Sequence, residues 1–472
     1  MKNNQRGRRD WIGSAARRGR EALGATLRIG RRSWARWTRA WDRLRAPQQL
    51  IVAFGINALV GTAVLCLPAA KEAPTAALDS LFNAVSAIST TGLTTTTVSG
   101  SYTMLGEFVL LALFQIGGIG VMTLSSLFIL ARGGELSAGR MGILKSQFAL
   151  PHYFVMRHFV VQVIAYTVIC ELLGAGLLWW RFAALGVDQP LWSAVFHSVS
   201  AFATAGFSLN SDSMESFAGD SVVNLVIGVL SYLGAIGFIV AQDVWYSLKL
   251  RERMLTFTSR VILSMTGGIF VLGTAMLFLF EPAIADLPPG QRLLTSAFQI
   301  MTASSTAGFN TIPMASLSSA GLVVIMIAML IGASPSGTGG GIKTTSVSAL
   351  LGNLLSVLLG RDRVVLLGHE VPTVRVLYAT AATTLYLAGL TVGVVVLCFT
   401  ERQGFLPVVF EAASAIGTVG LSMGITGELT APGKLVIITL MLAGRCGPLT
   451  IGLALLRPMP APGGLRRDDL AV

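Results

Sequence analysis

The sequence predicts an all-α polytopic membrane protein in which four repeated units place eight transmembrane helices and four re-entrant pore helices around a pseudo-fourfold central pore. Of its 472 residues, 53% are hydrophobic and only 12% are charged. Apolar runs long enough to cross about 30 Å of hydrocarbon recur along the chain. Between pairs of these runs lie four segments too short to span a bilayer, and all four contain the same motif. Such a repeat predicts four pseudo-equivalent elements.

The repeated motif ends in a loop centred on a glycine. The first copy, residues 82–94, reads FNAVSAISTTGLT. The other copies read FHSVSAFATAGFS, FQIMTASSTAGFN and FEAASAIGTVGLS, and they begin at residues 196, 298 and 410. Every copy has Phe ten residues before the glycine, Ser or Thr six before it and Thr two before it. The four glycines are Gly92, Gly206, Gly308 and Gly420.

Each unit is predicted to run from an apolar span through a short half-helix to a second apolar span. The predicted elements are Gln49–Leu67, Leu78–Ser89 and Met104–Leu130 in unit one, Phe159–Phe182, Leu191–Ala203 and Val222–Leu248 in unit two, Val261–Phe280, Arg292–Ser304 and Ala320–Leu359 in unit three, and Val376–Phe399, Leu406–Gly417 and Leu435–Leu456 in unit four. Re-entrant backbone is tolerated only inside protein or beside an aqueous cavity. Four short surface helices are the alternative, which leaves the repeated glycine loop unexplained.

These elements divide the chain into four repeats between two terminal segments. The predicted boundaries are 49–131 for repeat 1, 132–258 for repeat 2, 259–360 for repeat 3 and 361–456 for repeat 4, with a cytoplasmic tail at 457–472. The N-terminal segment 1–48 carries +11 of the formal net charge of +12, and Trp34, Trp37 and Trp41 share one face of a helix. A basic helix with an aromatic stripe fits the surface of an anionic membrane. Nucleic-acid binding is disfavoured, whereas a disordered positive tail remains an alternative for residues 1–25.

The distribution of charge predicts the orientation. Lys and Arg gather in the connections between units, as with Arg140, Arg251 and Arg363, whereas acids such as Asp220 and Glu281 flank the half-helices. By the positive-inside rule, the unit connections and both termini are cytoplasmic. The glycine loops then lie toward the opposite side, where the acidic flanks attract cations.

The glycine loops have the chemistry of a cation-binding ring. Glycine reaches positive φ at little cost, and Thr adds hydroxyl and carbonyl oxygens. Four such loops around an axis supply oxygens that replace the hydration shell of a monovalent cation. With one glycine fixed in each loop, the selectivity is expected to be looser than in a strict channel. The predicted ion-binding residues are Thr90, Thr91, Gly92, Thr204, Ala205, Gly206, Thr306, Ala307, Gly308, Thr418, Val419 and Gly420.

Among the four second spans, only that of unit three is expected to be interrupted, and the interruption predicts a gate. Its middle reads GASPSGTGGGIKTT over residues 332–345, and Pro335 with the following glycines opposes a continuous helix. A flexible loop just below the ring suits an intramembrane gate. A nucleotide-binding motif is disfavoured, because Ile342 separates the last glycine from the lysine and no strand precedes it. The predicted gate residues are Gly337, Gly339, Gly340, Gly341, Lys343 and Arg445.

Arg445 lies ten residues into the apolar run that begins at Leu435. A guanidinium at this depth needs partners, and its five donors suit carbonyls and hydroxyls. We expect Arg445 to hydrogen-bond the 332–345 loop and to hold it across the pore, where its charge adds a barrier to cations. A brace between helices with no effect on transport is the alternative. Lys343 either shares the barrier or extends to the cytoplasmic interface.

Further polar residues lie within the apolar runs. Glu171, in the middle of a span, is predicted to be a hydrogen-bonded structural residue. The residues nine positions before the glycines are all polar, and they are expected to satisfy the half-helix backbone or to line the outer wall. They are Asn83, His197, Gln299 and Glu411. No nucleophile with a base and no Cys/His cluster appears in the sequence, so an enzyme and a zinc site are disfavoured.

The glycine loops, SGTGGGIKTT in the broken span and AGRCGPLTIGL at 443–453 resemble the Trk/Ktr/HKT superfamily of cation transporters over about residues 49–456. The bacterial Ktr membrane subunit is the most similar. The resemblance implies potassium uptake across the bacterial cell membrane, a homodimer, and a separate cytoplasmic ring of nucleotide-binding regulatory subunits. Potassium is then the substrate held at the filter residues, sodium is left open as an activator, and no cofactor is expected. An alternating-access carrier for another small cation or solute is the alternative.

Overall fold

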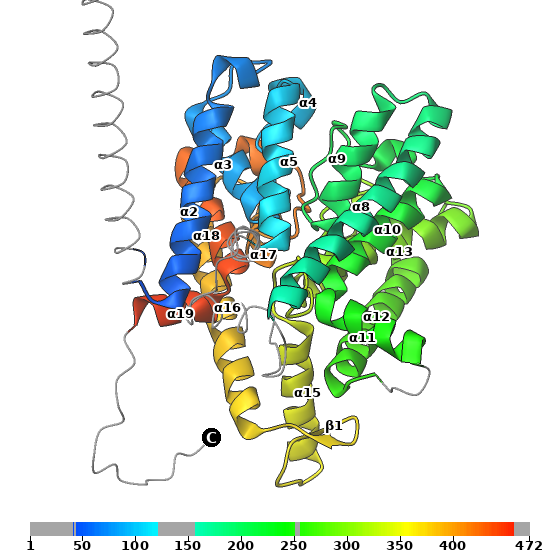
Figure 1. The fold of residues 1–472 in the computed structure, drawn as a ribbon, viewed down its shortest axis with the longest axis vertical. Helices are drawn as coiled ribbons and strands as arrows, with labels where there is room; N and C mark the ends of the chain where they lie inside the picture. Colours follow the sequence, from blue (N-terminus) through cyan, green and yellow to red (C-terminus); the bar gives the residue numbers. More distant parts are fainter. Residues whose placement is uncertain (1–40, 42–43, 121–155, 251–254, 457–472) are drawn as a thin grey trace, which may run out of the picture.

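The protein, seen here as a computed structural model, is mainly helical in the part that the structure describes, which is residue 41 and residues 44–120, 156–250 and 255–456 (Figure 1). Each unit begins with a long helix. These are α2 (Ala46–Leu65), α8 (Met156–Leu185), α12 (Phe257–Phe280) and α16 (Thr373–Thr400). A short helix that carries the repeated motif follows. These are α3 (Ala77–Ile88), α9 (Pro190–Phe202), α13 (Pro289–Ser305) and α17 (Phe405–Gly417).

The last part of each unit is a second helix that ends or breaks midway. These helices are α5 (Met104–Ile119), α10 and α11 (Ser221–Ile236 and Phe238–Leu250), α14 and α15 (Ser319–Leu330 and Thr344–Leu358), and α18 and α19 (Ala431–Cys446 and Pro448–Leu455). The remaining elements are short. They are α4 (Val98–Ser101), η1 (Pro68–Ala70), η2 (Glu215–Phe217), η3 (Pro282–Ile284), η4 (Met314–Ser316), η5 (Thr426–Glu428), and β1 (Val365–Leu366) paired antiparallel with β2 (His369–Glu370).

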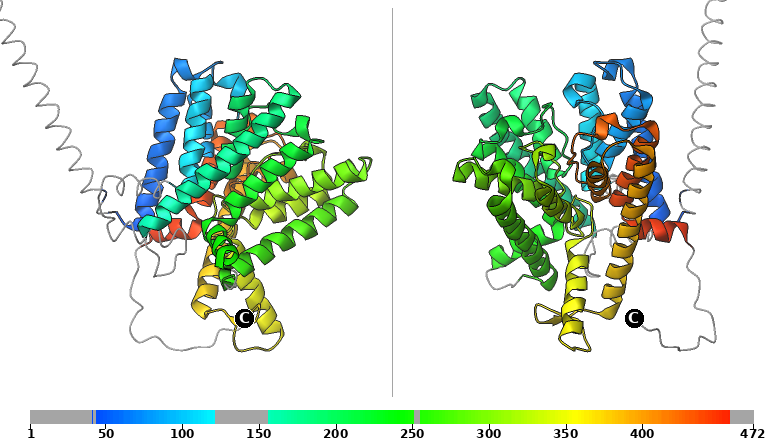
Figure 2. Two further views of the ribbon diagram at one scale, coloured as in Figure 1. Left: turned by 45° about the vertical axis from the view of Figure 1, so that its right-hand side comes forward. Right: turned by 180° about the vertical axis from the view of Figure 1, so that it is seen from behind.

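The second helix of each unit packs against the short helix of the next unit. α5 contacts α9, α10 contacts α13, and α14 contacts α17. The cycle closes because α18 of the fourth unit contacts α3 of the first. The phenylalanine that opens each motif is buried inside this ring of helices, at Phe82, Phe196, Phe298 and Phe410. Among the described elements, α15, the adjoining end of α16 and the β-hairpin extend well beyond the other helices (Figure 2).

By length and composition, four of the described helices can each cross a membrane: α2, α8, α12 and α16. Two bent pairs, α10 with α11 and α18 with α19, raise the number to six if each pair is one span. α5, α14 and α15 are apolar but shorter. The eight spans expected from the sequence are not reached by this criterion, because the second helices end or bend early.

The expectation that only the third unit has a broken second span is wrong. The chain turns by 99° between α10 and α11 and by 94° between α18 and α19. Gly237 and Gly447 lie at these turns with φ of 89° and 82°, and α5 ends at Gly120 with φ of 93°. Glycine adopts such angles without the strain of a side chain. The sequence does not reveal these breaks, because a lone glycine in an apolar run is compatible with a continuous helix.

Two buried acids that follow the long helices α12 and α16 bind the N-cap residue of the second helix in the same unit. Glu281 accepts hydrogen bonds from the amide and the hydroxyl of Ser318, the N-cap of α14, at 3.0 and 2.7 Å. Glu401 accepts the same pair from Thr430, the N-cap of α18, at 3.0 and 2.6 Å. Asp220 caps α10 and pairs with Arg181. Glu281 and Asp220 therefore have structural roles in the fold. The expectation that the acidic flanks attract cations stays a prediction.

Several sequence-based expectations concern residues outside the described part. They include most of the basic segment 1–48, the connections 121–155 and 251–254 with Arg140 and Arg251, and the tail 457–472.

We expect Glu401→Ala to destabilise the protein by about 1–3 kcal/mol, because the amide and hydroxyl of Thr430 lose hydrogen bonds to a charged acceptor. Thermal unfolding in detergent, followed by tryptophan fluorescence, measures the effect. Glu428→Ala is the matched control, since Glu428 is an exposed acid in the same unit, and its midpoint should equal that of the parent. Equal midpoints for all three proteins would contradict this role of Glu401.

Candidate functional site

The four short helices end in the same unusual backbone conformation. The threonine two residues before each motif glycine is left-handed, with φ of 53° at Thr90, 51° at Thr204, 59° at Thr306 and 50° at Thr418. A β-branched residue rarely adopts this conformation, because its Cβ crowds the backbone. The glycines that follow also have positive φ, at 93°, 68°, 84° and 95°. Strain of this kind persists only where the surroundings hold it.

Backbone hydrogen bonds hold each of these helix ends. In every unit the amide just before the glycine donates to the carbonyl five residues earlier, which is the bond of a Schellman-type C-cap. The four bonds are Thr91 to Ser86 at 2.9 Å, Ala205 to Ser200 at 2.8 Å, Ala307 to Thr302 at 2.9 Å and Val419 to Ser414 at 2.9 Å. The four loops therefore share one geometry.

The loops form a closed ring in the order of the units. A Cβ on Gly92 would lie 2.5 Å from the carbonyl oxygen of Ala205, and a Cβ on Gly206 would lie 2.6 Å from that of Ala307. Gly308 lies equally close to the carbonyl of Val419, and Gly420 closes the ring against the carbonyl of Thr91. No side chain fits at these contacts. The structure thus brings together all twelve residues that the sequence predicts as ion-binding.

A hydroxyl six residues before the glycine gives the ring a support whose role the sequence did not reveal. Ser86 accepts a hydrogen bond from the amide of Gly92 at 3.1 Å, and Ser414 accepts one from Gly420 at 3.0 Å. Ser200 instead donates to the carbonyl of Phe207 at 2.8 Å. The hydroxyl of Thr302 has no partner in the described part of the chain. The recurrence of Ser or Thr at this position was the available signal.

The segment between α14 and α15 is a loop anchored at both ends and in its middle. The amide of Gly332 donates to the carbonyl of Ile342 at 3.0 Å, which joins its two ends. The amides of Ser334 and Thr338 each donate, at 3.1 Å, to carbonyls at the end of α10. The predicted interruption is therefore present, and it is an ordered loop against the second unit.

This loop lies across the threonines of all four units. The hydroxyls of Thr338 and Thr204 are 3.0 Å apart, and the hydroxyl of Thr90 reaches the carbonyl of Thr338 at 3.5 Å. A Cβ on Gly339 would collide with the hydroxyl of Thr306, and one on Gly340 with that of Thr418. Three consecutive loop residues thus cover the ring from one side, and two of them must be glycine.

Two cationic side chains bind the same loop. Arg445 donates to the carbonyls of Thr338 and Gly117, and to the hydroxyl of Thr90 at 2.9 Å. The hydrogen bond from Arg445 to the loop, expected from the sequence, is present. Lys343 donates to the carbonyls of Gly339 and Gly340 at 2.7 and 3.4 Å. The ammonium group of Lys343 is therefore bound to the loop itself.

The remaining predicted gate glycines, Gly337 and Gly341, also make close backbone contacts. Gly337 lies against the carbonyl of Ala235, and Gly341 has φ of 73° and lies against Gly332. Away from the ring, Glu171 accepts a hydrogen bond from Gln115 at 2.9 Å, as expected of a structural residue. No cluster of His, Cys, Asp or Glu suited to a metal occurs among the described residues.

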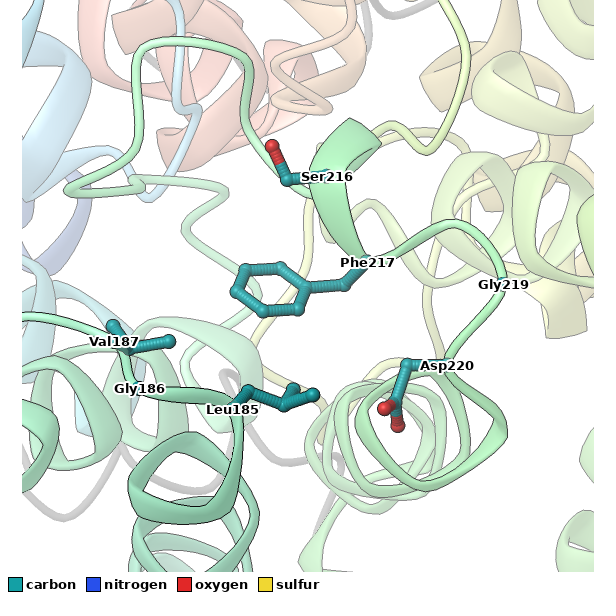
Figure 3. Close-up of a pocket in the computed structure, with 7 residues that line it drawn as sticks. All are labelled: Leu185, Gly186, Val187, Ser216, Phe217, Gly219 and Asp220. Carbon is teal, nitrogen blue, oxygen red and sulfur yellow. The ribbon is translucent and has the colours of Figure 1, made fainter.

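A surface depression lies apart from the ring, between the end of α8 and the start of α10 (Figure 3). Leu185, Val187 and Phe217 contribute its apolar lining. The carboxylate of Asp220 at its edge pairs with Arg181 at 2.6 Å and caps α10. Its charged group is therefore already engaged within the fold.

Comparison with known proteins gives the family context. Residues 21–463 match the family model TrkH, described as cation transport protein. The chain is 33% identical to Ktr system potassium uptake protein B of Vibrio alginolyticus, over 88% of this chain and 92% of the relative. It is also 33% identical to potassium/sodium uptake protein NtpJ of Enterococcus hirae, over 87% of this chain and 93% of the relative.

A solved structure has the same fold. The potassium transporter TrkH of Vibrio parahaemolyticus superimposes with a TM-score of 0.68, over 86% of this chain and 83% of its own. The sequence identity is 20%, so this likeness concerns the fold alone.

We expect Ser414→Ala to speed hydrogen exchange at the Gly420 amide by roughly fivefold, because that amide loses a hydrogen bond of about 1 kcal/mol. Mass spectrometry of peptides that cover the fourth loop measures the exchange. Thr302→Val is the matched control in the third unit, where the hydroxyl has no partner among the described residues, and it should leave exchange at Gly308 unchanged. Unchanged exchange in Ser414→Ala would mean that the hydroxyl does not support the ring.

Proposed function

The chain belongs to the TrkH family of cation transport proteins, and from this membership we propose that it takes up potassium through a pore formed by the four glycine loops. As the sequence indicates, the family consists of membrane transporters and not of enzymes. The observation that carries the proposal is the closed ring in which each glycine lies against the carbonyl of the next loop.

The proposed architecture has eight spans and four re-entrant helices around one axis. The cyclic packing of α5 on α9, α10 on α13, α14 on α17 and α18 on α3 supports a pseudo-fourfold arrangement. In this arrangement the second span of each unit crosses the bilayer with a break at a glycine or a loop. Both termini and the unit connections are on the cytoplasmic side of the cell membrane, by the positive-inside rule.

The filter is the set of twelve loop residues from Thr90–Gly92, Thr204–Gly206, Thr306–Gly308 and Thr418–Gly420. Backbone oxygens at this ring replace water around a dehydrated potassium ion. The ends of the four short helices lie at the loops, and their partial negative charge favours a cation there. Potassium is the transported substrate, and sodium is a candidate activator.

The gate is the loop 331–343 with Arg445. It covers the ring through Thr338, Gly339 and Gly340, and Arg445 and Lys343 place two positive charges on it. A cation that leaves the ring meets this barrier, so the loop must move for conduction. Its hydrogen bonds to the end of α10 and to Arg445 are the contacts that opening breaks.

The names of two relatives, both Ktr system potassium uptake protein B, indicate that this chain has partner subunits. A protein called part of a Ktr system works with further components, so we include a homodimer and a cytoplasmic nucleotide-binding ring in the proposal. The described hairpin region presents Arg361 and Arg363 on the cytoplasmic side, of which Arg363 pairs with Glu370. These charges are a candidate docking surface.

We expect Gly92→Ser, Gly206→Ser, Gly308→Ser and Gly420→Ser each to weaken potassium-over-sodium preference by about tenfold or more, because each side chain displaces a carbonyl of the ring. Uptake of radioactive Rb⁺ into proteoliposomes, competed by K⁺ or Na⁺, measures the preference. Gly186→Ser is the control, since Gly186 also has positive φ but lies in open space. Four ring variants that compete like the parent would contradict the filter.

We expect Arg445→Ala, and a deletion within Ser336–Gly341, to raise the rate of Rb⁺ uptake severalfold, because the loop loses its anchor and the pore loses a positive charge. Arg402→Ala removes an exposed arginine of the same unit as Arg445 and should leave the rate unchanged. If both gate variants reach the membrane, fold and conduct no faster than the parent, the loop is not the gate.

A further inference from the structure

Four equivalent side chains connect the short helices to the segments that leave the ring. They lie nine residues before the glycines and are all buried, at Asn83, His197, Gln299 and Glu411. In each unit the side chain bonds a residue two to four positions beyond the glycine. The bonds are Asn83 to Thr96 at 3.3 Å, His197 to Ser208 at 3.0 Å, Gln299 to Thr311 at 3.0 Å and Glu411 to Ser422 at 2.8 Å.

Among these four positions, only the fourth unit has an acid. Both carboxylate oxygens of Glu411 are engaged, Oε2 by the hydroxyl of Ser422 and Oε1 by the hydroxyl of Thr426. The side chain is completely buried. No Lys, Arg or His within the described residues pairs with it.

A buried carboxylate with hydroxyl partners alone has its hydrogen bonds satisfied but not its charge. Such a charge is costly unless a positive charge lies near. Ser422 is two residues beyond Gly420, so Glu411 lies directly behind the fourth loop of the ring. A cation bound in the ring would supply the compensating positive charge for Glu411.

We propose that the Glu411 carboxylate sets the affinity of the ring for its cation by supplying a fixed negative charge behind the fourth loop. This inference rests on the proposed transport function. Glu411 does not touch the ion; its field acts through the low-dielectric interior, where Coulomb interactions are stronger than in water. Asn83, His197 and Gln299 make the equivalent hydrogen bonds in the other three units but add no negative charge.

The test is the concentration dependence of Rb⁺ uptake by the full chain in proteoliposomes. Glu411→Gln keeps the shape and the ability to bond both hydroxyls but removes the charge. The half-saturating Rb⁺ concentration is expected to rise roughly tenfold, the effect of one charge at about 10 Å with an effective dielectric constant of about 20. The maximal rate and the thermal unfolding midpoint should stay near those of the parent. Glu428→Gln, an exposed acid in the same unit, is the control and should leave half-saturation unchanged.

A second variant separates charge from local structure. Gln299→Glu places a carboxylate at the equivalent position of the third unit, beside the hydroxyl of Thr311. In the Glu411→Gln background it is expected to return half-saturation most of the way to the parent value. If Glu411→Gln does not fold, Gln299→Glu in the parent decides, and it should lower half-saturation severalfold.

Unchanged half-saturation in Glu411→Gln overturns the inference. So does an increase that Gln299→Glu does not reverse, because Glu411 then acts through its local hydrogen bonds. If only Gln299→Glu in the parent can be measured, an unchanged half-saturating Rb⁺ concentration also overturns the inference. A parent chain that carries no Rb⁺ contradicts the proposed function, and this inference with it.

Discussion

The structure depends on one repeated close contact, between a glycine of each loop and the carbonyl of the next loop. Gly92 lies so close to Ala205 that no side chain fits, and Gly420 meets Thr91 in the same way. Because the contact runs in one direction around four units, it closes only if all four helix ends have the same conformation. The left-handed threonines supply that conformation at a cost in strain. The cyclic packing of the helices holds the ring from outside and offsets that cost.

The breaks in the second helices follow from what lies beneath the ring. The loop 331–343 covers the ring from one side, and its own backbone needs hydrogen-bond partners. The end of α10 provides them, because the helix stops at Gly237 and leaves carbonyls free for Ser334 and Thr338. Gly117 of α5 gives its carbonyl to Arg445 in a similar way. The ends of α5, α10 and α18, the last of which carries Arg445, therefore form one connected polar layer with the loop inside an apolar protein.

The sequence predicted the features that recur in every unit, but it did not predict features that depend on packing between distant parts of the chain. The motif predicted four short helices and their glycine loops, because the same residues recur at the same spacing. The loop of unit three was predicted from Pro335 and its glycines, and Arg445 from the cost of a buried charge. The turns at Gly237 and Gly447 were missed, since each depends on what packs against a single glycine. The caps by Glu281 and Glu401 were missed because they join residues far apart in the chain.

The departures from fourfold symmetry gather in units three and four. Unit three contributes the loop that covers the ring, and unit four contributes Arg445, which holds that loop to Thr90 of unit one. Unit four also replaces a neutral side chain with Glu411 behind its own loop. A positive group thus lies on the covered side of the ring, and a negative group lies behind the segment that leaves on the other side. For a cation in the ring, both charges oppose passage toward the loop. In the pore that we propose, the ion is held until the loop moves, so that two residues of one unit, Glu411 and Arg445, link ion affinity to gating.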